Sequence, residues 1–161
     1  MSAGLPLVQW ILDTNIWLDW FVFEQTADSP VAQLQRHIEQ DAGEVHRVLM
    51  TQAMWDEWVD VLARPQFAID AQRQAQILAQ TRALVQWVET PPTPRQRIRC
   101  ADRDDQVFID VALACRVDWL ISKDRHLLRL HNRARLWGVR VVTPQDWLKS
   151  MAASCAPCSA A

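Results

Sequence analysis

The sequence predicts an α/β fold in which helices cover both faces of a mainly parallel central sheet of about five strands, a three-layer α/β/α sandwich. Apolar runs of strand length alternate with longer segments whose apolar residues recur at helical spacing, as expected for a sheet built from β-α units. Short apolar runs, such as residues 48–50 and 139–142, fit strands that are buried on both faces. Acidic residues follow two of the runs, and open sheets of this class bind ligands at the carboxyl ends of their strands.

The strand candidates are short runs with the length and apolar content of buried strands, at residues 7–12, 46–50, 84–88, 118–122 and 139–142. Helices are expected between them because apolar residues recur on one face, at residues 30–40, 52–63, 71–83 and 103–116, with another helix around Leu127 and Leu128. Pro65 is expected to close the second helix. The prolines of residues 91–94 favour an irregular loop, because each proline disfavours helix at the residue before it.

The composition fits one domain at residues 1–150 followed by a flexible tail at residues 151–161. Half of the 161 residues are hydrophobic, which supplies a core and excludes a disordered chain. The sequence contains neither a long uninterrupted apolar stretch nor a signal peptide, so we expect a cytoplasmic location. Cys100 and Cys115 are expected to be reduced thiols that fill space. Cys155 and Cys158 form a CxxC in the tail, either a frayed end or half of a zinc site.

Charge is unevenly distributed along the chain. Residues 1–94 carry a net charge of −7 and residues 95–161 a net charge of +5, within a total of −2. A basic half of this kind indicates either a face that binds a polyanion or ordinary solvated surface. The nine tryptophans are explained mostly by packing, and base stacking by one of them is the alternative.

Four carboxylates that are far apart in the sequence are the main candidates for a functional site: Asp13, Glu57, Asp105 and Asp124. Asp13 and Asp124 follow strand candidates, so both should reach the carboxyl edge of the sheet. Like charges gathered there repel each other and need a cation, and oxygen ligands suit Mg²⁺ or Mn²⁺. This pattern favours a metal-dependent enzyme that cleaves phosphodiesters.

Each carboxylate also has a structural interpretation. Asp13 and Asp124 are both suited to cap a helix. Glu57 lies near the apolar stripe of its helix, where a carboxylate requires a partner such as an arginine. Asp102, Asp104 and Asp105 cluster at the start of the helix expected at 103–116, where capping needs only one acidic residue. We expect Asp102 to be the cap and Asp105 to project into the crevice, with Asp104 as a second candidate.

Four motifs and a closing strand in this chain resemble those of PIN-domain proteins, in the bacterial branch described as toxin components of toxin–antitoxin pairs. The matching segments run from about residue 8 to residue 148 and comprise Ile11 to Asn15, Glu57 with Val61 to Pro65, Asp104 to Phe108 with Ala112, Leu120 to Leu128, and Val141 to Pro144. One position departs from the family pattern, because Lys123 stands where a glycine is usual. Lys123 could contact phosphate or weaken metal binding through its charge.

The resemblance implies a PIN-like α/β/α fold and Mg²⁺- or Mn²⁺-dependent cleavage of single-stranded RNA. Its metal ligands would be Asp13, Glu57, Asp105 and Asp124, with Asn15 and Ser122 as supporting groups. The expected partners are single-stranded RNA, a cognate antitoxin and a second copy of the chain. RNA backbone would be held by arginines on the basic half: Arg95, Arg97, Arg99, Arg103 and Arg125.

Two other functions compete with this interpretation. A non-catalytic module that binds RNA or protein could keep the same fold. A phosphatase that acts on a small substrate would share an aspartate after the first strand, but it requires a second aspartate two residues later as acid and base. Asn15 occupies that position and cannot serve as a general acid.

Overall fold

The computed structural model of the chain describes residues 6–23, 25–89, 91, 93–94 and 96–155. Its centre is a five-stranded, all-parallel sheet with the order β3-β2-β1-β4-β5. The strands are short and match the expected ones to within one or two residues at each end: β1 (Val8–Leu12), β2 (His46–Met50), β3 (Val85–Trp87), β4 (Trp119–Ile121) and β5 (Arg140–Val142).

The direction of strand addition reverses once, between β1 and β4. The first three strands run outward from β1, and the chain then crosses back to place β4 on the other side of β1. Right-handed crossovers on either side of such a reversal put the connecting helices on opposite faces of the sheet. A reversal point of this kind opens a crevice at the carboxyl ends of the two strands, which is where doubly wound sheets bind ligands.

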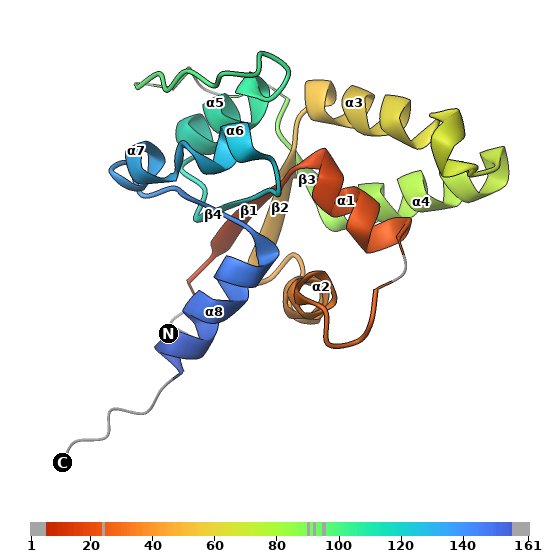
Figure 1. Cartoon of the computed structure of the whole chain (residues 1–161), viewed down its shortest axis with the longest axis horizontal. Helices are drawn as coiled ribbons and strands as arrows, with labels where there is room; N and C mark the ends of the chain where they lie inside the picture. Colours follow the sequence, from red (N-terminus) through yellow and green to blue (C-terminus); the bar gives the residue numbers. More distant parts are fainter. Residues whose placement is uncertain (1–5, 24, 90, 92, 95, 156–161) are drawn as a thin grey trace.

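Helices cover the sheet in the arrangement expected for a three-layer fold (Figure 1). The first half of the chain contributes α1 (Thr14–Phe21), α2 (Pro30–Gln40), α3 (Gln52–Leu62), a 3₁₀ turn (Pro65–Phe67) and α4 (Ala71–Leu84). The second half contributes α5 (Gln106–Cys115), α6 (Arg125–Leu128), α7 (His131–Arg135) and α8 (Pro144–Ser154). Helix α8 returns to pack against α2. Among the described residues, no helix is both long enough and apolar enough to cross a membrane.

Local sequence signals explain where most helices begin. The side chains of Ser29, Thr51, Asp70 and Thr143 each accept a hydrogen bond from the first turn of the helix that follows. Such caps satisfy amide groups that have no partner within the helix. Helix α2 and helix α8 also have proline in their first turn, where its missing amide hydrogen costs nothing.

The structure differs from the sequence-based expectation at several boundaries. Helix α5 begins at Gln106 rather than at residue 103, and α8 continues to Ser154, so residues 151–154 are helical rather than part of a tail. Helices α1, α7 and α8 were not among the expected helices. Helix α1 starts only two residues after β1 and is apolar on most sides, with Ile16, Trp17 and Trp20 all buried. Periodicity alone does not separate so short an apolar helix from a continuing strand.

The core lies between the sheet and both helical layers. Ile11 on β1 and Leu120 on β4 are fully buried at its centre, and six of the nine tryptophans are buried in or beside the core. The other three, Trp55, Trp87 and Trp137, are partly or largely exposed. The expected packing role therefore accounts for most of the tryptophans.

Candidate acidic site

Asp13 lies at the junction between β1 and α1, and its carboxylate is held by three donors. Its side chain is 4% exposed. The Thr14 amide donates to Oδ1 at 2.7 Å, while the Asn15 amide group and the Ser122 hydroxyl donate to Oδ2 at 3.1 and 2.6 Å. Burial raises the pKa of Asp13, and these hydrogen bonds oppose the increase. Asp13 is therefore a helix cap and also a member of a buried polar network.

Ser122 connects the ends of β1 and β4. Its hydroxyl donates to Asp13, and its oxygen accepts a hydrogen bond from the Asp124 amide at 2.9 Å. The Asp124 carboxylate caps α6 by accepting from the His126 amide at 2.7 Å. Both aspartates thus cap helices, as their structural interpretation proposed, and the same geometry holds them at neighbouring strand ends. The charge of Asp124 contributes to the raised pKa of Asp13.

Glu57 approaches this group from α3 and is oriented by α1. The Thr14 hydroxyl donates to its Oε1 at 3.0 Å. Burial is the main cause that raises the pKa of Glu57, and the charges of Asp13 and Asp104 add to it. The arginine ion pair considered for Glu57 is not found among the described residues, where Arg64 pairs with Asp60 instead.

Asp105 is the candidate carboxylate that the described residues stabilise least through hydrogen bonds. It occupies the position before α5, yet its side chain makes no capping hydrogen bond, and its buried Oδ2 has no partner among the described residues. Burial, followed by the charges of Asp13, Asp124 and Asp102, raises the pKa of Asp105 to about 7, and a hydrogen bond between the protonated form and the Asp124 side chain adds to the increase. A buried carboxylate oxygen without a donor is costly, so this position favours a proton or a cation.

The expected capping role of Asp102 is wrong. Its Oδ1 accepts from the Asp104 amide at 2.9 Å, which closes a turn ahead of the helix. The helix starts later than expected, at Gln106, so Asp102 is too far upstream to reach its first amides. Asp104 is exposed, and its charge acts on Glu57.

The carboxylates therefore share one electrostatic environment. The charges of Asp13 and Asp124 both raise the pKa of Asp105, and the charge of Asp13 raises that of Glu57. Among the described residues, however, no three Asp, Glu, His or Cys side chains already converge closely enough to hold one ion. The chemistry of the donors fits a divalent cation, because all are carboxylate oxygens and one lacks any partner. The donors would have to move closer together to bind it.

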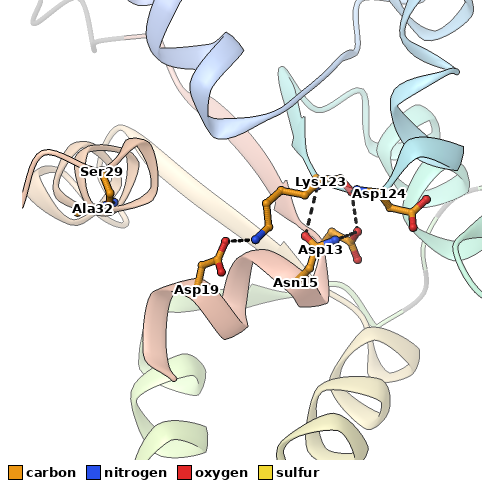
Figure 2. Close-up of polar contacts among 8 residues, drawn as sticks. Asp13, Asn15, Asp19, Ser29, Ala32, Lys123 and Asp124 are labelled. Carbon is orange, nitrogen blue, oxygen red and sulfur yellow. Dashed lines mark hydrogen bonds and ion pairs between the residues drawn. The ribbon is translucent and has the colours of Figure 1, made fainter. Parts of the chain in front are cut away.

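Lys123, which replaces the glycine usual in the family pattern, forms an ion pair with Asp19 on α1. Figure 2 shows its side chain reaching along α1 to Asp19, while Asp13 and Asn15 lie at the start of that helix and the Asp124 carboxylate points away from them. The Asp19 carboxylate is nearly buried, so Lys123 neutralises a charge that would otherwise be costly there. Its amide also donates to Asn15 at 3.4 Å. Lys123 thus ties the β4–α6 connection to α1.

Two candidate arginines alternate with buried residues just before α5. Arg97 and Arg99 are exposed, whereas Ile98 and Cys100 are buried, so both guanidinium groups lie on the outer side of the segment. Gln106 fixes this segment to α5, because its side chain accepts from the Cys100 amide at 2.7 Å and donates to the Ile98 carbonyl at 2.9 Å.

The other candidate arginines are less informative. Arg103 and Arg125 are exposed, and Arg95 lies outside the described residues.

Cys100 and Cys115 are free thiols in buried and half-buried positions, and burial raises the pKa of each. Of the CxxC pair, Cys155 is an exposed free thiol and Cys158 lies outside the described residues.

Sequence reasoning missed three residues that organise this region: Thr14, Asp19 and Gln106. Thr14 lies between two residues that were singled out, and a hydroxyl beside a buried aspartate was the available signal. Asp19 falls on the apolar α1, where a lone acidic residue indicates a buried partner. Nothing in the sequence indicated the role of Gln106, because its partners are backbone atoms of an irregular segment.

Comparisons with known proteins agree with this architecture. A family model described as "PIN domain" matches residues 9–126, which include all four candidate carboxylates. The chain is similar to the crystal structure of PAE2754 from Pyrobaculum aerophilum, with a TM-score of 0.57 and 18% sequence identity over 94% of each chain. At this identity the likeness concerns the fold. No protein with a curated description matches the sequence at a significant level.

Proposed function

The chain belongs to the PIN-domain family, and from this premise we propose that it is a divalent-metal-dependent endoribonuclease that cleaves single-stranded RNA. PIN domains are generally nucleases that use divalent ions. The observation that carries the proposal for this chain is the state of Asp105. Its buried Oδ2 has no donor in the described part of the chain, and its pKa is raised to about 7 by burial and by other carboxylates. A divalent cation would remove both costs.

The proposed ligands are Asp13, Glu57, Asp105 and Asp124. Ser122 and Asn15 would orient Asp13, because both donate to the same oxygen, Oδ2. Thr14 would orient Glu57 through its hydroxyl. Groups that fix the direction of ligand side chains in this way support metal binding. Asp104 is a further candidate beside Glu57.

A divalent ion at this position would supply polarisation of the scissile phosphate and a nucleophilic water at neutral pH. The chain itself would do the positioning. Rigid strand ends would keep the carboxylates on one edge of the sheet, and the exposed Arg97 and Arg99 would attract the phosphate chain despite the acidic centre. Lys123 would act indirectly, because its ammonium group is paired with Asp19.

The proposal extends to a biological role as the toxin of a toxin–antitoxin pair, on the basis of the motif resemblance. Expression of the chain alone should then arrest bacterial growth, and co-expression of a small protein encoded beside it should restore growth. Size-exclusion chromatography with light scattering would test the expected homodimer. Growth arrest that persists in an Asp124→Asn variant would contradict a toxic activity based on this site.

A substrate panel tests the enzymatic proposal. Protein stripped with EDTA should be inactive, and added Mn²⁺ or Mg²⁺ should produce internal cuts in single-stranded RNA, with little cleavage of duplex RNA. The same preparations should be tested on p-nitrophenyl phosphate. Cleavage of the phosphate ester alone would favour a phosphatase, and RNA binding without cleavage under any metal condition would favour a non-catalytic module.

A further inference from the structure

A second site lies on the same edge of the sheet as the carboxylates, around two partly exposed tryptophans. Trp55 lies in the first turn of α3, and Trp87 is the last residue of the edge strand β3. Their ring centroids are 5.4 Å apart and the ring planes are inclined at 58°. Together with Gln52, Arg82 and Glu89 they line an open pocket of about 490 Å³.

The sheet register places this pocket near the acidic site. Trp87 pairs with Met50, the last residue of β2, and β2 lies beside β1, which ends at Leu12 just before Asp13. Neighbouring strands are about 4.8 Å apart, so Trp87 lies about 10 Å across the sheet from the end of β1. Trp55 is also on the helix that carries Glu57.

The lining of the pocket suits a flat, uncharged ring. One cation, Arg82, and one anion, Glu89, line it, so the pocket as a whole does not favour a phosphate or a carboxylate. The guanidinium carbon of Arg82 is 5.6 Å from the Trp87 ring centroid, near the outer limit of a cation–π contact. Arg82 is exposed and can turn from the ring to a neighbouring phosphate.

We propose that Trp55 and Trp87 form a stacking subsite for an unpaired base of the RNA, next to the nucleotide whose phosphate is cut. This inference rests on the proposed function. Bases of single strands stack on aromatic side chains without requiring a particular sequence. Bases inside a duplex cannot enter such a pocket, so the subsite gives a physical reason for selectivity toward single strands. The competing explanation is that the two rings only cover the edge strand.

Binding of labelled oligonucleotides, measured by fluorescence anisotropy in EDTA so that no RNA is cut, tests the subsite. A six-nucleotide RNA is compared with an abasic ribose-phosphate chain of equal length. Trp55→Ala and Trp87→Ala should each weaken binding of the RNA by about 5- to 100-fold and leave the abasic chain unaffected. Trp55→Phe should keep most of the affinity, because it keeps an aromatic face.

The matched control is Trp137→Ala, because Trp137 is 49% exposed and lines a different pocket beside the C-terminal end of α5. It should leave both affinities unchanged. Melting temperatures identify any variant that fails to fold. Arg82→Ala, which leaves both rings in place, should weaken binding of the RNA and of the abasic chain alike, because both carry phosphates. Unchanged RNA affinity in the Trp55 and Trp87 variants, or equal loss for both ligands, overturns the subsite.

Failure of the subsite is distinguishable from failure of the proposed function. If the variants bind RNA normally while the wild-type protein cleaves RNA with Mn²⁺, the nuclease stands and the subsite is wrong. If the wild-type protein shows no preference for base-bearing RNA, the subsite is also wrong, and metal-dependent cleavage is judged separately.

Discussion

The two ends of the parallel sheet bury titratable groups with opposite consequences. At the carboxyl end, burial and like charges raise the pKa values of Asp13, Glu57 and Asp105. At the amino end, burial lowers the pKa values of His37 and His46, and the charge of Asp41 opposes the change. Both environments disfavour the charged form of their groups. They differ in how readily the neutral form is accommodated.

The amino end is a packed aromatic cluster. The His37 and His46 ring centroids are 4.7 Å apart, and both rings contact Trp10. The Trp10 indole donates to His46 Nδ1 at 3.2 Å, which requires that nitrogen to be unprotonated. Neutral histidine therefore completes the packing here, and no ligand is needed.

The carboxyl end is accommodated less well. Protonation of Asp105 allows a hydrogen bond with the Asp124 side chain, but Asp13 and Glu57 are also buried with raised pKa values, and ionised Asp105 leaves its buried Oδ2 without a partner among the described residues. Buried groups that fit in their neutral form indicate a structural role, whereas buried groups that repel one another and remain unsatisfied indicate a site for a ligand. The predictions below test this difference between the two ends.

Asp124→Asn should have the largest effect on activity. It removes a proposed ligand charge while Oδ1 can still cap α6, so the fold should survive. Cleavage should fall by roughly a hundredfold or more, because the loss of an ion's contribution is worth several kcal/mol. Asp146→Asn, at an exposed position on α8, is the matched control. Near-normal rates in Asp124→Asn would exclude this residue from the site.

Ser122→Ala should reduce metal affinity or activity by about 10- to 100-fold. The hydroxyl links the Asp124 amide to the Asp13 carboxylate, so its loss frees Asp13 to turn. Ser150→Ala is a suitable control, because that hydroxyl donates to the Trp147 carbonyl of its own helix. Metal titrations followed by melting temperature would separate a weakened metal site from a slower chemical step. Equal behaviour of the two variants would show that the serine link is not required.

Asp105→Asn should stabilise the metal-free protein at pH 8 by on the order of 2 kcal/mol, or several degrees in Tm. The folded-state pKa of Asp105 is about 7 and its ordinary value is 3.8, so the folded state binds more protons between these values. The contribution of Asp105 to stability in EDTA should therefore fall as pH rises from about 4 to 7, so the advantage of the variant over the wild type should grow across this range. Saturating Mg²⁺ should reverse the ranking. A stability difference between the two proteins that stays constant or shrinks as pH rises would refute the charge repulsion.

Asp13→Asn should change stability in the other direction, despite the same loss of charge. Both oxygens of Asp13 accept hydrogen bonds, and asparagine has only one oxygen. The donors at one of the two oxygen positions would then face the NH₂ group of the asparagine, which would lower the stability of the folded protein by about 1–3 kcal/mol. Thermal unfolding of the two variants in EDTA is the measurement. A stabilised Asp13→Asn variant would mean that repulsion outweighs the hydrogen-bond network.

His37→Gln tests the amino end and should have the smallest effect. The lowered pKa values mean that the unfolded chain binds more protons than the folded one below about pH 6.5. The contribution of the two histidines to wild-type stability should thus decrease as pH falls through this range. The variant should show a weaker decrease, with unchanged metal-dependent cleavage at pH 8. An unchanged acid slope would place the acid sensitivity elsewhere in the molecule.

The fold could be predicted from the sequence because its strands are short apolar runs in a regular β-α alternation. The candidate carboxylates could be identified because three of them follow strands or precede a helix, where parallel topology brings them together. Their partners could not be identified. The contacts of Ser122 and Thr14 join residues far apart in the chain, Ser122 to Asp13 and Thr14 to Glu57, and one sequence does not encode such pairings in any local pattern.

The first and last helices, α1 and α8, also could not be predicted from the sequence. Helix α1 follows β1 without a loop, and its buried tryptophans leave little polar face to mark a helix. The pairing of Lys123 with Asp19 depends on that helix, so the departure from the family pattern at Lys123 could be noticed but not explained. Tertiary packing determines both features.

The most direct test of the account is cleavage of one labelled single-stranded RNA by the EDTA-stripped protein during a stepwise addition of Mn²⁺. A metal-dependent site requires no cleavage without the ion, activity that rises to saturation, and a parallel rise in melting temperature as the ion binds the folded protein. Asp124→Asn should show neither the activity nor the full rise in melting temperature. Undiminished cleavage in EDTA, or equal activity of the Asp124→Asn variant, would contradict the claim that these carboxylates form a metal-dependent nuclease site.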